Sequence, residues 1–178
     1  MEYRIGRELI SEEDLRLEVE ELAKKIREDY RGQELICVCV LKGAVVFLTD
    51  LIRAIGPEVD VRIDFLAISS YGASTHSSGV VKIQKDLSTD VLGKNVLIVE
   101  DILDTGLSLT YLKKLLENRH PASLEICVMF DKPSRRKLKV DVKYSGIEIP
   151  DDFVIGYGLD YAGKFRNLKS LHIAEPEE

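Results

Sequence analysis

The chain has few of the features that mark membrane-bound, secreted or disulfide-bonded proteins. No stretch approaches the ~18 consecutive apolar residues of a membrane span, and residues 1–4 lack the apolar core of a signal peptide. Cysteines number only three, an odd count, and Cys37 and Cys39 lie together in an apolar run without CxxC spacing. We therefore expect reduced thiols packed in the core of a cytoplasmic protein, rather than disulfides or a metal site.

The chain also lacks an excess of positive charge. Its 25 Lys and Arg face 31 Asp and Glu, which gives a net charge of −6. A protein that binds nucleic acid or an anionic membrane surface is more often basic, so we expect neither partner. Any phosphate site must then be local. The 178 residues, 45% of them hydrophobic, suffice for one domain with a buried core.

Residues 96–110 combine a buried strand, a polar turn and the start of a helix. Four branched apolar residues, 96–99, predict a strand buried on both faces, as in a parallel sheet. Leucines from Leu109 to Leu116 recur at helical spacing. The turn between them holds Glu100, Asp101, Asp104, Thr105, Gly106, Leu107 and Ser108.

This turn has the composition of a site for a sugar phosphate. The first N–H groups of a helix have no intrahelical partner and the helix dipole favours an anion, so residues 104–108 can hold a phosphate without a lysine. Glu100 and Asp101 suit a sugar diol or Mg²⁺ instead. Together they predict a pocket for a ribose 5-phosphate. The alternative is an acidic surface loop in which Asp104 merely caps a helix.

Two further apolar runs end in a lysine. Residues 35–41 are followed by Lys42 and Gly43, and residues 124–130 lead to Lys132. The carboxyl ends of parallel strands are where α/β folds place their ligands. Either lysine is alternatively a solvated surface residue. At a site, the Lys132 ammonium would donate to a carbonyl oxygen, which selects a 6-oxopurine over a 6-aminopurine.

Helices and strands alternate along the rest of the chain, which predicts an α/β fold. We expect helices from Ser11 to about Tyr30 and at 45–55, and strands at 59–68, 80–84 and 140–146. Residues 69–79 are rich in Ser, Thr and Gly, as in a functional lid or a disordered excursion. We interpret one basic cluster as a solvated face and assign it no role: Arg135, Arg136, Lys137 and Lys139.

Residues 96–108 resemble the phosphoribosyl pyrophosphate (PRPP) signature of the type I phosphoribosyltransferases. The form Glu-Asp-Ile-Leu-Asp-Thr-Gly at 100–106 is similar to that of the hypoxanthine-guanine phosphoribosyltransferases. Four other places match in the family's order: residues 41–43, Ser70 with Tyr71, Lys132, and residues 153–166. The resemblance therefore covers most of the chain.

The resemblance implies a fold and an activity. The fold is a central, mostly parallel sheet flanked by helices, with a small C-terminal hood. Residues 1–178 would form one domain, its core at about 11–132 and its hood built from the N-terminal lead and about 133–178. The activity is Mg²⁺-dependent transfer of 5-phosphoribosyl from PRPP to N9 of hypoxanthine, and of guanine, giving IMP or GMP and pyrophosphate. The resemblance also implies a homodimer or homotetramer.

The resemblance further implies a role for each matching residue. Asp104 is the general base, and the 5-phosphate binds Asp104, Thr105, Gly106, Leu107 and Ser108. Some relatives carry lysine at the position of Leu107, which here offers only its backbone N–H. The ribose and Mg²⁺ bind Glu100 and Asp101, with Asp160 as a further Mg²⁺ ligand. Pyrophosphate binds Leu41, Lys42, Gly43 and Arg166, and the Leu41–Lys42 peptide is expected to be cis. The purine binds Lys132, Phe153, Val154 and Asp160, and Ser70 and Tyr71 lie on a closing lid.

One alternative belongs to a different class. Regulators that sense PRPP and bind RNA or DNA reuse this fold. The charge of −6 and the lack of an aromatic-basic stripe argue against it. Among enzymes, the pattern does not rank hypoxanthine against guanine or xanthine.

Overall fold

The computed structural model of the chain describes residues 2–70 and 81–177. The strands are β1 (Tyr3–Ile10), β2 (Glu34–Leu41), β3 (Asp60–Ser70), β4 (Val81–Lys85), β5 (Asn95–Leu103), β6 (Ser123–Asp131), β7 (Tyr144–Glu148), β8 (Val154–Ile155) and β9 (Leu171–Pro176). The helices are α1 (Glu12–Tyr30), α2 (Val45–Ile55), α3 (Leu107–Glu117) and a 3₁₀ turn, Pro133–Arg135. None of the helices in the described ranges is long and apolar enough to cross a membrane.

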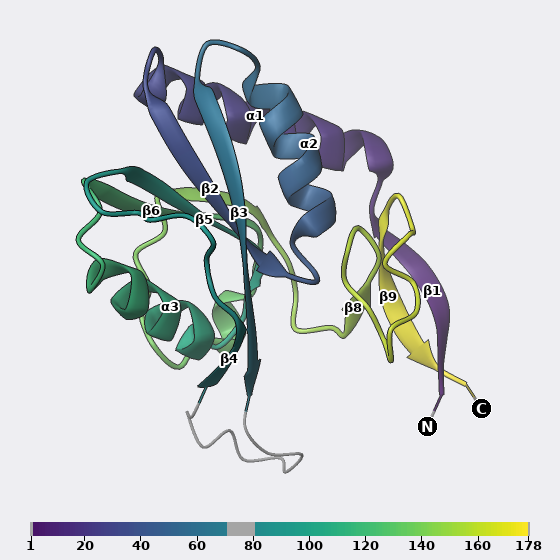
Figure 1. Cartoon of the computed structure of the whole chain (residues 1–178). Helices are drawn as coiled ribbons and strands as arrows, with labels where there is room; N and C mark the ends of the chain where they lie inside the picture. Colours follow the sequence, from purple (N-terminus) through teal and green to yellow (C-terminus); the bar gives the residue numbers. More distant parts are fainter. Residues whose placement is uncertain (1, 71–80, 178) are drawn as a thin grey trace.

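Six strands form the main sheet in the order β4-β3-β2-β5-β6-β7. Neighbours are parallel except at the β3–β4 edge, which is antiparallel. Helices α1 and α2 cover one face of this sheet and α3 covers the other (Figure 1). This is the predicted α/β architecture, with β5 in the interior of the sheet between β2 and β6.

The interior strands are apolar on both faces because both faces are covered. On β5, Leu97 and Val99 belong to the core beneath α1 and α2. Val96 and Ile98 belong to the core beneath α3. All four are completely buried, as predicted from the uninterrupted apolar run.

The cysteines are core residues. Cys37 and Cys39 on β2 and Cys127 on β6 are buried and free. Burial raises the pKa of Cys37 to about 12 and that of Cys39 to about 12. The thiols are therefore protonated at neutral pH and act in packing, which confirms the expectation of reduced core cysteines.

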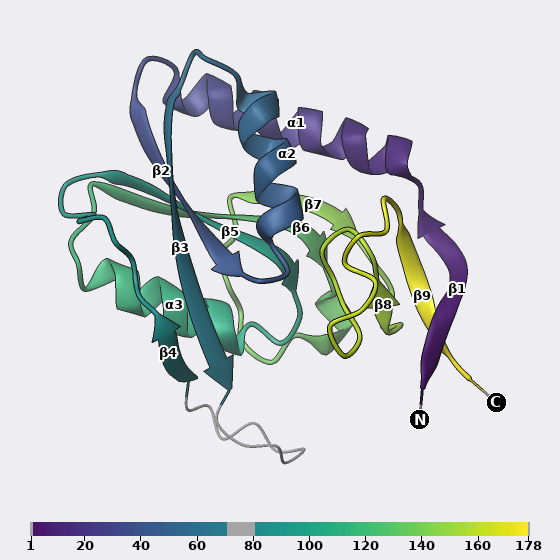
Figure 2. The ribbon, with the colours of Figure 1, turned by 45° about the vertical axis from the view of Figure 1, so that its right-hand side comes forward.

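A second, smaller sheet has the order β1-β9-β8 and forms the hood with its connecting loops. Figure 2 shows it on the side to which the arrowheads of β2 and β7 point. The N-terminal lead is a strand here, because β1 pairs antiparallel with β9 and places Tyr3 opposite Pro176. Strand β7 joins the main sheet, so that sheet extends beyond the boundary expected near residue 132.

The predicted lid lies at the edge of the described part of the chain. Ser70 is the last residue of β3, and its side chain is not described. Tyr71 lies outside the described residues. The lid assignment thus stays a prediction.

One buried carboxylate joins β3 to the segment before β5. Asp64 is only 4% exposed, and it accepts hydrogen bonds from the backbone N–H groups of Phe65 (2.7 Å), Ser88 (2.9 Å) and Thr89 (2.7 Å). Burial alone would raise the pKa of Asp64, but these hydrogen bonds outweigh it and lower the pKa below its ordinary value. The ionised form is therefore the one that stabilises the fold.

We predict that Asp64→Asn lowers the free energy of unfolding by about 1–3 kcal/mol at pH 7, because a charged acceptor of three N–H groups is lost. A lowered folded-state pKa stabilises the protein above the unfolded pKa of about 3.9 and loses this effect as the pH falls through the folded value. Urea unfolding of wild type and variant should therefore differ fully at pH 7 and converge in acid. Asp60→Asn, an exposed change on the same strand, is the control, and an equal loss in both variants would contradict the prediction.

Candidate active site

The carboxyl ends of three parallel strands and the hood border one cavity of about 430 Å³. Strand β2 ends at Leu41 and leads to Lys42 and Gly43, β5 leads to the acidic turn, and β6 leads to Lys132. The site residues predicted from sequence that line this cavity are Leu41, Lys42, Gly43, Glu100, Asp101, Asp104, Ser108, Lys132, Phe153, Val154, Asp160 and Arg166. Residues far apart in the chain thus meet at one edge of the sheet.

A second cavity of about 280 Å³ adjoins the first. Glu100, Asp101 and Asp104 line both cavities. Thr105 and Gly106 line the second one only. The acidic turn therefore separates a larger chamber beneath the hood from a smaller one at the start of α3.

The loop after β2 packs tightly against the acidic turn. The Leu41–Lys42 peptide is cis, as the resemblance implied. A Cβ atom placed on Gly43 would lie 1.7 Å from Asp101 Oδ2. A side chain at position 43 would displace this carboxylate, so glycine is what lets the loop lie directly against Asp101.

Two adjacent carboxylates lie at the end of β5. Asp101 is 9% exposed, and its Oδ1 accepts the Ile102 N–H at 2.6 Å. Burial and repulsion from Asp101 raise the pKa of Glu100 well above its ordinary value, and burial also raises the pKa of Asp101. The ionised form of such a pair is stabilised by hydroxyl groups that donate hydrogen bonds to it, or by a bound cation.

The carboxylate pair is suited to a magnesium ion that arrives with a substrate. No cluster of three or more metal-ligating side chains occurs among residues 2–70 and 81–177. Mg²⁺ commonly binds one or two protein carboxylates and completes its shell with phosphate oxygens and water. Glu100 and Asp101 fit that pattern.

The start of α3 is built for a backbone contact with an anion. Gly106 is the N-cap, has φ of +84°, and makes no side-chain capping bond. The alternative in which Asp104 caps this helix is therefore wrong. A Cβ on Gly106 would lie 2.5 Å from the Leu138 carbonyl oxygen, so glycine is required both by its φ and by its neighbour.

Two arginines of the basic cluster contact this turn, a role that the sequence analysis did not assign. Arg136 donates through Nε to the Asp104 carbonyl at 3.0 Å, and its Nη2 contacts the Leu103 carbonyl and the Asp131 carboxylate. Arg135 Nε lies 2.9 Å from Asp104 Oδ1. The cluster thus supports the acidic turn from the end of β6.

The far side of the larger cavity is formed by Lys132 and the hood. Lys132 is 6% exposed, and its Nζ donates to the Asp152 carbonyl at 2.6 Å. Phe153 is 46% exposed and Val154 is buried. This part of the cavity therefore has the Lys132 ammonium group and the Phe153 ring in its lining.

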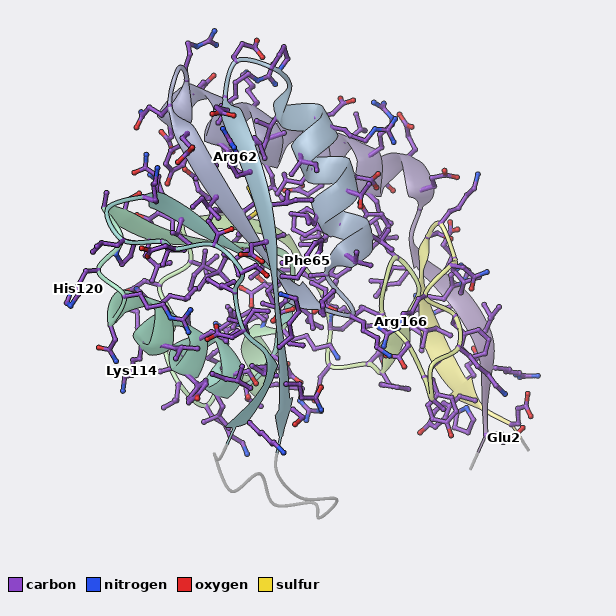
Figure 3. The ribbon with its side chains drawn as sticks, viewed as in Figure 1. Glu2, Arg62, Phe65, Lys114, His120 and Arg166 are labelled. Carbon is purple, nitrogen blue, oxygen red and sulfur yellow. The ribbon has the colours of Figure 1, made fainter. Side chains whose placement is uncertain are left out.

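Arg166 is fixed within the hood by a carboxylate. Its Nη2 lies 2.7 Å from Asp160 Oδ1, and its Nη1 donates to the Gly158 carbonyl at 2.7 Å. The Gly163 N–H donates to Asp160 Oδ2 at 2.7 Å. Figure 3 shows Arg166 between the main sheet and the hood. Asp160 thus positions Arg166 at the cavity.

Comparison with known proteins agrees with this geometry. Residues 8–162 match the family model of the phosphoribosyl transferase domain. The chain belongs to this family.

Two curated relatives of the family carry the same name. The hypoxanthine-guanine phosphoribosyltransferase of Mycobacterium avium is 47% identical over 94% of this chain and 85% of its own length. The enzyme of that name from Staphylococcus aureus strain Mu50 is 46% identical over 95% of this chain and 93% of its own length.

Two solved structures resemble the chain over nearly its full length. The crystal structure of a hypoxanthine-guanine phosphoribosyltransferase from Bacillus anthracis has a TM-score of 0.91 and 43% identity, covering 98% of this chain and 100% of that one. That of a hypoxanthine phosphoribosyltransferase from Staphylococcus aureus has a TM-score of 0.92 and 44% identity, covering 97% and 92%. The central sheet, flanking helices and hood are thus features of the family.

We predict that Arg136→Met loosens the turn at residues 104–108, because two carbonyl groups and a carboxylate lose their donor. Amide hydrogen exchange at Lys137 and Leu138, whose N–H groups donate to the Thr105 carbonyl (2.9 and 3.1 Å), should become faster by about tenfold or more, given ~1.5–3 kcal/mol for hydrogen bonds to charged groups. Lys139→Met, an exposed change in the same segment, is the control. Unchanged exchange in Arg136→Met would show that the turn does not depend on this arginine.

Proposed function

We propose that the chain is a hypoxanthine-guanine phosphoribosyltransferase of purine salvage. It transfers 5-phosphoribosyl from PRPP to N9 of hypoxanthine, and of guanine, with release of pyrophosphate. The observation that carries this proposal is a continuous site in which the carboxylate pair lines both cavities. The proposal is further supported by relatives of 46% and 47% identity that bear this name.

The PRPP end of the site lies on the main sheet. The smaller cavity is the place for the 5-phosphate, held by hydroxyl groups and the first N–H groups of α3. Leu107 contributes only its backbone there. Glu100 and Asp101 accept hydrogen bonds from the ribose hydroxyls. Pyrophosphate extends toward residues 41–43 and Arg166.

Mg²⁺ is the cofactor that this proposal includes. Glu100 and Asp101 would hold it together with oxygen atoms of PRPP, and Asp160 would contact a further ion through water. When bound, the ion neutralises charge on the pyrophosphate leaving group. Lys42 and Arg166 add positive charge at the same group as it departs.

The base end of the site lies beneath the hood. Lys132 would donate to the exocyclic oxygen of a 6-oxopurine, in place of its bond to the Asp152 carbonyl. Phe153 would stack on the purine ring, and backbone groups near Val154 and Asp160 would meet its edge. A 6-amino group has no acceptor to offer to Lys132, so adenine is disfavoured.

The transfer itself requires one proton to move. The bond between the anomeric carbon and pyrophosphate breaks, and its electron pair leaves with pyrophosphate. The purine nitrogen N9 forms the new bond to that carbon, while the N7 proton passes to the Asp104 carboxylate. The transition state resembles an oxocarbenium ion, so positioning of both substrates contributes much of the rate.

The cellular setting and the assembly follow from the same proposal. Buried, free thiols support a reducing, cytoplasmic location. A homodimer or homotetramer is supported by apolar side chains exposed on the surface, among them Val45 on α2 and Ile63 on β3. The nucleic-acid-binding regulator receives no support from the relatives, whose names are those of enzymes.

We predict turnover with PRPP, Mg²⁺ and either hypoxanthine or guanine, and none with adenine, because Lys132 offers a donor to the six position. A spectrophotometric assay with hypoxanthine, guanine, xanthine and adenine in parallel measures this and ranks the bases. Equal turnover of adenine would exclude the selective role of Lys132. Binding of PRPP without turnover of any purine would favour the regulator.

We also predict that Asp104→Asn lowers kcat by about a hundredfold or more, as expected for loss of a general base, with a much smaller effect on PRPP affinity. Steady-state kinetics give kcat and titration calorimetry gives the PRPP affinity. Asp151→Asn is the matched control, since Asp151 is an exposed carboxylate that also pairs with Arg135. An unchanged kcat in Asp104→Asn would remove Asp104 from the role of base.

A further inference from the structure

An aromatic ring that is nearly half exposed needs support if it is to keep one orientation. Phe153 is 46% exposed, and among the described residues that line the larger cavity it is the only aromatic one. It directly precedes β8, a strand of two residues. The element that bears Phe153 is therefore short, and contacts from elsewhere must hold the ring.

Two tyrosines contact Phe153 from outside the cavity. The Tyr3 ring is 5.3 Å from the Phe153 ring in an edge-to-face arrangement with an interplanar angle of 66°. The Tyr161 ring is 6.1 Å from Phe153 and 4.8 Å from Tyr3. Neither tyrosine lines the cavity. The three rings therefore form a cluster of which only Phe153 faces the site.

Tyr3 reaches this cluster because the N-terminal strand is tied into the hood. The Ala174 N–H on β9 donates to the Phe153 carbonyl at 2.8 Å. On its other side β9 pairs with β1, where Ile5 is opposite Ala174. Strand β9 thus binds both the backbone of Phe153 and strand β1. Tyr3 is two residues before Ile5, the residue of β1 that lies opposite Ala174.

We propose that Tyr3 is a positioning residue of the purine subsite and acts through Phe153. Its ring fixes the Phe153 ring in the orientation in which the open face of Phe153 can stack on a purine. The inference rests on the proposed function and extends it to the N-terminal strand. Most of the PRPP groups lie on the main sheet, and Arg166 of the hood is held by Asp160 and the Gly158 carbonyl, not by Tyr3. We therefore expect Tyr3 to affect the affinity for the base and not that for PRPP.

The test compares Tyr3→Ala, Tyr3→Phe and wild type in the PRPP-dependent assay with hypoxanthine. Loss of an edge-to-face pair should raise KM for hypoxanthine about three- to tenfold in Tyr3→Ala, with kcat and KM for PRPP changed less than about twofold. Tyr3→Phe keeps the ring and should restore the wild-type KM. The affinity for IMP, measured by calorimetry without turnover, should fall in parallel with the rise in KM.

Two further variants separate positioning from simple loosening of the strand. Arg4→Ala removes an ion pair with Glu175 across β1 and β9 (3.2 Å) and leaves the aromatic cluster intact, so its KM for hypoxanthine should stay at the wild-type value. In a Phe153→Leu background, Tyr3→Ala should have no further effect on the KM for hypoxanthine, because the aromatic ring through which Tyr3 acts is absent.

Each contrary outcome is distinct. An unchanged hypoxanthine KM in Tyr3→Ala, an equal rise in Arg4→Ala, or an undiminished effect in the Phe153→Leu background would overturn the role of Tyr3. Absence of any purine turnover in the wild type would instead overturn the proposed function. The two failures can be told apart, because one is seen in the variants and the other in the wild type.

Discussion

The structure of this site depends on one costly arrangement, two neighbouring carboxylates at the end of an interior strand, of which Asp101 is buried and Glu100 is half-buried. Strand β5 is covered on both faces, so the chain that leaves it starts in a region poor in water. Burial raises the pKa of both Glu100 and Asp101, and the absence of a side chain at Gly43 lets the neighbouring loop lie against the Asp101 carboxylate. Such a pair is stabilised by ligands that bring hydroxyl groups or a cation.

Positive charge is distributed around this pair by elements other than β5. Lys42 follows β2, Lys132 follows β6, and Arg166 belongs to the hood. Arg135 and Arg136 face Asp104 from the opposite side of the acidic turn. A chain with a net charge of −6 thus places five of its 25 Lys and Arg residues around these carboxylates. The local balance of charge is compatible with an anionic ligand in an acidic protein.

Local patterns in the sequence predicted the local structure well. Helix α2 has the predicted bounds, 45–55, and Ser11 caps α1 through a hydrogen bond from the Asp14 N–H. The cis peptide at Leu41–Lys42 came from the resemblance and not from spacing. The contacts of Arg136 were missed, and the resemblance placed the N-terminal lead in the hood without predicting that β1 pairs with β9. Both involve residues that are distant in the chain. Neither the basic cluster at 135–139 nor the polar segment 1–10 has a periodicity from which its contact partner can be predicted.

The division of the site between two sheets separates two kinds of recognition. Most groups suited to phosphate, ribose and pyrophosphate follow strands of the main sheet, and Arg166 of the hood lines the same cavity. Groups suited to the base, Phe153 and Val154, lie at a two-residue strand held by the strands at the two ends of the chain. Lys132, the proposed contact of the six position, follows β6 of the main sheet and lines the same cavity as Phe153. Affinity for the base should therefore depend on Tyr3, which contacts Phe153, in addition to the residues that line the cavity.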